Sequence, residues 1–136
     1  TCPEYVMDRL LLLSAGTITA VPTFVQAAAI AALQADTAPM KEIYARRREF
    51  VCSRLRQMGL SFPEPEGAFY VFPDIRKFGM TSEAFCEKLL MEYGVAIVPG
   101  TAFGACGEGF ARISYAYSVE HIAKAIDRIE KFTRKN

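Results

Sequence analysis

The sequence has 136 residues and a mass of 15.1 kDa, which is enough for one domain with a buried core but too little for several. Hydrophobic residues make up 51% and charged residues 23%, a composition that excludes a chain disordered throughout. Sixteen Lys and Arg against fifteen Asp and Glu leave a net charge of +1, so we expect no nucleic-acid partner.

The cysteines and the histidine are too few and too scattered for a metal site. The four cysteines include no C-x-x-C pair and stand at positions 2, 52, 86 and 106. With His121 as the one histidine, no metal ligand set is expected, and we expect the thiols to be buried apolar side chains. Dispersed thiols without a leader predict a cytoplasmic protein. The longest apolar run, residues 24–33, is shorter than the about 20 residues that cross a bilayer, so no membrane partner is expected.

The first part of the chain predicts two apolar helices. Pro3-Glu4 starts a short helix that runs to Leu13, and Pro22-Thr23 starts a second over residues 24–33. The second helix is apolar nearly all round, so it must be buried on most sides. A chain of this size offers too little surface to cover both helices. We therefore expect residues 1–35 to contact something outside this chain.

Residues 40–58 predict a long amphipathic helix that ends at Gly59. It contains the basic triplet Arg46-Arg47-Arg48. Successive helical residues point about 100° apart, so the triplet predicts a solvated helix face rather than one basic patch.

The second half of the chain predicts a small sheet with covering helices. The expected elements are, in order, a strand over 68–72, a helix capped by Thr81 or Ser82 and closed by Gly94, a strand over 95–98, a glycine-rich loop over 99–109, a strand over 110–116, and a helix capped by Ser118. This order predicts an α/β chain of the α+β kind, with a three- to four-stranded sheet covered by helices.

Arg112 is the side chain with the clearest chemical use. Strand alternation places it on one face with Phe110 and Ser114. From the strand alone, an ion pair with a nearby acid or a side chain reaching water is the favoured interpretation. The alternative is a bidentate clamp for a ligand carboxylate, which the planar donor fork of arginine suits.

The glycine-rich loop and the lysines give weaker signals. The loop over 99–109 matches neither the dinucleotide fingerprint nor the P-loop. It is either a connection that needs backbone freedom or a mobile loop that closes over a ligand. The six lysines stand in charged settings, so none is expected to act as a nucleophile.

Three segments in fixed order carry a resemblance to a known family. They are residues 65–72 (PEGAFYVF), 94–104 (GVAIVPGTAFG) and 107–115 (GEGFARISY), and the upstream run 22–28 (PTFVQAA) fits the same pattern. Together they resemble the C-terminal part of the class I/II aminotransferases, pyridoxal-phosphate enzymes of the aspartate aminotransferase fold, known as fold type I. The resemblance covers essentially the whole chain.

The resemblance implies roles for named residues. It implies that Arg112 binds the substrate α-carboxylate and that Gly67, Phe103 and Gly104 lie near the substrate in the closed enzyme. The small domain of these enzymes rotates onto the large one when substrate binds. The resemblance therefore raises the carboxylate clamp above the ion pair.

The resemblance also implies that the chemistry lies upstream. The Schiff-base lysine and the other residues that hold the cofactor precede the matching segment in the family, so no catalytic, cofactor-binding or metal-binding residue is expected here. Residues 1–35 would link to a large domain and the dimer interface, and residues 36–136 would form the small domain. The expected partners are an amino acid, a 2-oxo acid, the protein's own large domain and a second copy in a homodimer.

We therefore expect a C-terminal fragment of an aminotransferase that is inactive alone. Two alternatives stay open. One is a pyridoxal-phosphate-dependent lyase of the same fold, since one fold supports several reactions. The other is a stand-alone amino-acid-binding module without chemistry.

Overall fold

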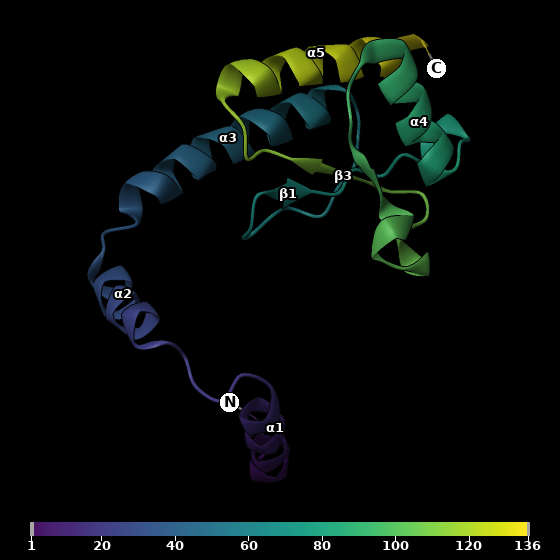
Figure 1. Cartoon of the computed structure of the whole chain (residues 1–136). Coiled ribbons are helices and arrows are strands. Elements are labelled where there is room, and N and C mark those ends of the chain that lie inside the picture. The colour runs from purple at the N-terminus through teal and green to yellow at the C-terminus, as the bar shows by residue number, and fades with distance from the viewer. Residues whose placement is uncertain (1, 136) are drawn as a thin grey trace. The chain divides into compact units, whose positions relative to one another are not determined.

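The computed structural model describes residues 2–135, which fall into two units divided between Thr37 and Ala38 (Figure 1). The first unit holds the helices α1 (Glu4–Thr17) and α2 (Thr23–Gln34). The second unit holds α3 (Ala38–Gln57), β1 (Tyr70–Val71), the 3₁₀ helix η1 (Arg76–Phe78), α4 (Ser82–Tyr93), β2 (Val98–Pro99), the 3₁₀ helices η2 (Gly100–Phe103) and η3 (Ala105–Gly107), β3 (Ala111–Ser114) and α5 (Val119–Lys135).

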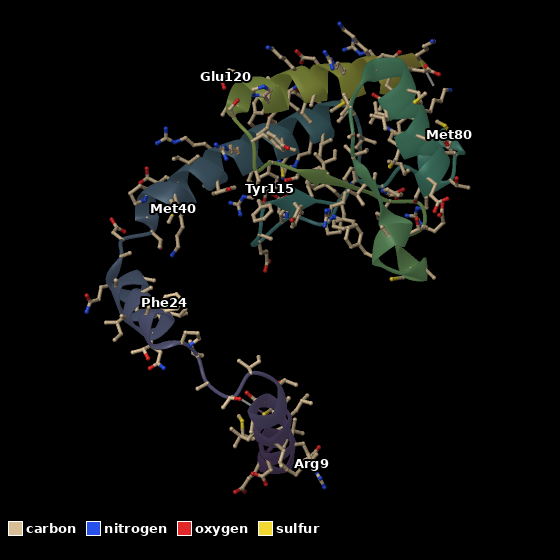
Figure 2. All side chains as sticks on the ribbon, viewed as in Figure 1. Arg9, Phe24, Met40, Met80, Tyr115 and Glu120 are labelled. Atoms are coloured by element: carbon tan, nitrogen blue, oxygen red, sulfur yellow. The ribbon has the colours of Figure 1, made fainter. Side chains whose placement is uncertain are left out.

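The two helices of the first unit each follow a proline and bury no residue. Phe24 projects outward from α2 (Figure 2) with 77% of its surface exposed. The predicted end of the first helix at Leu13 is wrong. The helix continues to Thr17, whose hydroxyl donates to the Leu13 carbonyl at 2.8 Å, and Thr19 with φ +65° lies just beyond its end. The docking of residues 1–35 on a larger domain and at a dimer interface stays a prediction.

The buried residues of α3 all lie in its C-terminal half. Val51, Cys52 and Leu55 are fully buried, whereas Ile43 in the first half is 48% exposed. The helix is followed by Gly59 in the left-handed region at φ +66°, a conformation that glycine adopts without a side-chain clash. The predicted amphipathic helix is thus confirmed.

The sheet has three antiparallel strands in the order β1-β3-β2, so β3 is central. Val71 pairs with Ile113 on one side of β3, and Val98 pairs with Arg112 on the other. A small sheet of three to four strands in a mixed α/β domain was expected and is confirmed. The strands are shorter than predicted because each edge strand pairs with β3 over only two residues.

The helices cover one face of this sheet. Figure 1 shows α3 and α5 side by side, and Arg54 of α3 bonds Asp127 and Glu130 of α5 at 2.7 and 2.8 Å. These hydrogen bonds raise the pKa of Arg54. Phe132 of α5 meets Phe85 of α4 edge to face, with ring centroids 5.0 Å apart. The core therefore lies between the sheet and these three helices.

The two halves of α3 give a matched test of this core. Leu55→Ala is expected to lower the free energy of unfolding by about 2–5 kcal/mol, because it leaves a cavity in a packed interior. Ile43→Ala removes a half-exposed side chain from the same helix and is expected to cost less than about 1 kcal/mol. Chemical denaturation of the chain measures both. Equal losses for the two variants would contradict the assignment of the core.

Candidate functional site

Arg112 lies on the face of the sheet that the helices leave uncovered. Along β3 the residues alternate between buried and partly buried, so Ala111 and Ile113 face the core and Arg112 faces away from it. Tyr70 of β1 reaches the guanidinium from one side of β3, with its ring centroid 4.2 Å from the guanidinium carbon. Phe103 of η2 reaches it from the side of β2, at 4.4 Å. Both distances are those of cation–π contacts.

No carboxylate among residues 2–135 lies within ion-pair distance of Arg112. Several other arginines do pair with an acid: Arg54, Arg56 and Arg76 each contact a carboxylate. The ion-pair interpretation of Arg112 is therefore wrong for the described part of the chain. The guanidinium of Arg112 contacts two rings and has donors free for an anion from outside.

The glycine-rich loop is held by its own backbone. Gly100 and Gly107 approach so closely that a Cβ atom on Gly100 would lie 2.1 Å from the Gly107 carbonyl oxygen. Gly100 N–H donates to the Phe110 carbonyl at 2.8 Å, and Gly107 N–H to the Gly104 carbonyl at 2.9 Å. Phe103 lies between these two glycines in the sequence and meets Phe72 edge to face at 5.6 Å. The loop is thus folded as two 3₁₀ turns rather than as a slack connection.

The predicted residues do not all come together. Phe103 contacts Arg112, and Gly104 follows it with φ +120°. Gly67 instead lines a cavity of about 440 Å³ beside α3, which Arg112 does not line. Ala68 next to it has φ +58°, and its carbonyl accepts a hydrogen bond from the Tyr115 hydroxyl at 3.3 Å. The nearness of Gly67 and Gly104 to a substrate stays a prediction.

Tyr70 is the ring that the sequence reasoning did not select. Its role depends on the register of β1, because Tyr70 pairs with Ser114, which shares the Arg112 face. Strand alternation places Tyr70 and Phe72 on the same face of β1. The sequence alone does not indicate which strand pairs with the one that carries Arg112.

The remaining titratable candidates do not form a second reactive centre. Burial raises the pKa of the Cys86 thiol to about 11, and burial likewise raises that of Cys52. Cys2 and Cys106 are exposed, so their expected burial is wrong; Cys106 lies in η3 at the surface of the loop. His121 is exposed and its Nδ1 lies 2.9 Å from the Ser118 hydroxyl, as expected for a surface residue.

Residues 2–135 contain no group of three or more His, Cys, Asp or Glu side chains arranged to hold a metal ion. Nor does any helix in this range have the length and apolar character to span a bilayer.

Asp74 and Arg76 form an ion pair just after β1. The Arg76 side chain and backbone N–H both bond the Asp74 carboxylate, the backbone N–H at 2.9 Å, and these bonds lower the pKa of Asp74. The Arg76 guanidinium also lies over the Phe110 ring, 5.4 Å from its centroid. Asp74 pairs with Phe110 in an isolated bridge, so this ion pair holds the chain that enters β3.

Comparison with known proteins identifies the family. Residues 1–129 match the model of the family described as aminotransferase class I and II. This chain belongs to the class I and II aminotransferase family.

Individual relatives agree with this membership. An aspartate aminotransferase of Pyrococcus abyssi is 43% identical over 98% of this chain, and an aromatic-amino-acid aminotransferase of Thermococcus litoralis is 41% identical over 98%. The solved structure of an aromatic aminotransferase from Pyrococcus horikoshii matches with a TM-score of 0.88 and 41% identity over 99% of this chain. The chain spans 36% of the two curated relatives and 37% of that solved chain, so it corresponds to about a third of an aminotransferase.

The Asp74–Arg76 pair predicts a change of stability with pH. The unfolded pKa of Asp is about 3.9 and the folded value is lower, so the pair contributes stability above about pH 4 and loses it as pH falls through the folded pKa. Asp74→Asn is therefore expected to be less stable than the wild type at pH 7, with the difference narrowing toward pH 3. Thermal unfolding from pH 3 to 7 measures this. Arg76→Gln removes the partner of Asp74, so its loss of stability relative to the wild type should also become smaller toward pH 3. A loss of stability that is the same at every pH would show that the ion pair does not cause it.

Proposed function

We propose that this chain is the small domain of a pyridoxal-phosphate-dependent aminotransferase, in which Arg112 binds the substrate α-carboxylate. One observation carries the proposal: a partly buried guanidinium, in contact with two rings, with no acid partner among residues 2–135. Family membership supports transamination as the reaction of the whole protein.

The surroundings of Arg112 suit a carboxylate. The rings of Tyr70 and Phe103 contact the guanidinium and cover part of it. The N–H donors of a guanidinium lie in its own plane, so a carboxylate can accept two parallel hydrogen bonds there. In such a setting a charged hydrogen bond is stronger than in water. Arg112 would therefore bind and orient the substrate through the one group that every α-amino acid carries.

One clamp can serve both halves of a transamination. The amino acid and the 2-oxo acid differ at the carbon that carries nitrogen or oxygen, but each keeps its α-carboxylate. Relatives named for aspartate and for aromatic amino acids share this segment with the chain. We propose that this domain recognises the part common to these substrates, and that selection of the side chain belongs to the rest of the protein.

The residues in this chain do not fit the cofactor. Pyridoxal phosphate supplies an electron sink for transamination and needs a lysine and a phosphate cradle. The six lysines all lie on α3, η1, α4 and α5, away from the strands and the glycine-rich loop. The amides of Gly100, Gly104 and Gly107 already donate to carbonyls of the loop and of Phe110. We propose that residues outside this chain hold the cofactor.

The remaining proposals concern the whole protein. We propose that residues 1–35, whose helices bury no side chain, pack on a larger domain and near the partner of a homodimer. A cytoplasmic location is likewise proposed. The chain alone is expected to be inactive.

The first test is transamination by the full-length protein with an amino acid and a 2-oxo acid. In that protein Arg112→Lys is expected to lower kcat/KM by about a hundredfold, because lysine keeps the charge but loses the bidentate fork. Arg128→Lys makes the same exchange on the exposed side of α5 and is expected to change kcat/KM less than about twofold. A wild type without transaminase activity, or Arg112→Lys at wild-type efficiency, would overturn the proposal.

A second test separates the ring of Tyr70 from its hydroxyl. Tyr70→Leu removes the cation–π contact and is expected to raise KM for the amino acid by about fivefold, whereas Tyr70→Phe keeps the ring and is expected to leave KM within about twofold. Steady-state kinetics of the full-length protein measure both. An equal rise in the two variants would assign the effect to the hydroxyl instead.

A further inference from the structure

The glycine-rich loop is tied at its base to the start of α4. Ser82, the first residue of that helix, is fully buried. Its hydroxyl accepts a hydrogen bond from Gly109 N–H at 2.9 Å and lies 3.5 Å from the Gly107 carbonyl, to which it donates. Its backbone N–H donates to the Glu108 carboxylate at 2.9 Å. We refer to Ser82, Glu108 and the backbone of Gly107 and Gly109 as the Ser82 latch.

The Ser82 latch also provides a hydrogen-bond acceptor for the N-terminus of α4. The first N–H groups of a helix have no partner within it and favour a negative charge. Thr81 caps α4 by accepting from Ala84 N–H at 3.2 Å, while Glu108 reaches in from the loop to accept from Ser82. The carboxylate is thus held by a charge-assisted hydrogen bond, which is stronger than a neutral one.

The latch sits between the two parts of the Arg112 site. Upstream, the crossing of Gly100 and Gly107 closes the loop that carries Phe103. Downstream, Gly109 leads within two residues into β3, where Arg112 lies. A shift of residues 107–109 would therefore move both the Phe103 ring and the start of the strand that bears the guanidinium.

We propose that Ser82 and Glu108 are positioning residues that set the geometry of substrate carboxylate binding. This inference rests on the proposed function of Arg112. Neither side chain contacts the guanidinium; both act through the loop. Their loss is expected to weaken binding of every α-carboxylate substrate, with little effect on the chemical step.

The test uses the full-length protein and four variants. Glu108→Ala removes the acceptor, Glu108→Gln keeps an oxygen acceptor without the charge, and Ser82→Ala removes the two hydroxyl bonds. Glu83→Ala is the matched control, because it removes an exposed acid from the same first turn of α4.

Two readouts separate positioning from stability. Amide hydrogen exchange, measured by mass spectrometry on peptides covering residues 100–109, is expected to quicken in Glu108→Ala and Ser82→Ala but not in Glu83→Ala. KM for the amino acid, and Kd for pyruvate by calorimetry, are expected to rise about tenfold in Glu108→Ala with kcat within about threefold, as for the loss of one charge-assisted hydrogen bond. Glu108→Gln keeps a neutral hydrogen bond and should recover part of the affinity.

Each other result overturns the proposal. Unchanged exchange in Glu108→Ala would show that the latch does not hold the loop. Faster exchange with unchanged KM and Kd would show that the latch only stabilises the fold, and a fall in kcat alone would place its role in the chemical step. If the wild-type protein binds pyruvate but does not transaminate, the proposed reaction is wrong. The Kd values of the wild type and the variants would then still decide whether the Ser82 latch positions the carboxylate site.

Discussion

The one-sided burial of the sheet is the constraint on which the rest of the second unit depends. Ala111, Ile113 and Tyr115 must face the helices, because they supply the apolar layer against which α3 and α5 pack. Because side chains alternate along a strand, the face of one residue determines the faces of all the others. A register shift of one residue would bury the guanidinium of Arg112 in an apolar core. The same packing that stabilises the domain therefore presents Arg112 on the open face.

A second constraint comes from backbone atoms rather than side chains. The carbonyls and α-carbons of Gly100 and Gly107 occupy space that any β-carbon would need, so the loop can close only with glycine at both positions. Closure of the loop brings the Phe103 ring onto the guanidinium of Arg112. The proposed clamp thus depends on two kinds of packing: an apolar core beneath the strand and a close crossing of backbone beside it.

The sequence predicted the features that depend on local chemistry. Thr81 caps α4 and Gly94 in the left-handed region ends it, both as expected. What it could not predict depends on partners distant in sequence. The strands are shorter than predicted because each edge strand pairs with β3 over two residues, and Asp127 of α5 bonds Arg54 of α3 across a long separation in sequence. Tyr70 enters the site through register alone, and Cys106 is exposed because η3 places it at the surface.

We propose that this domain binds the α-carboxylate and that the rest of the protein selects the side chain, because a carboxylate clamp cannot distinguish one amino acid from another. A guanidinium that reads the α-carboxylate accepts every amino acid, so it supplies affinity and orientation but no choice of side chain. A domain with that task can keep one geometry while the rest of the protein changes its substrate. That geometry must be reproducible, since a clamp that is loose by an ångström loses much of the benefit of orientation. The contacts on Arg112, the glycine crossing and the bonds from Ser82 to residues 107–109 are the features of this chain that would hold the guanidinium in one geometry.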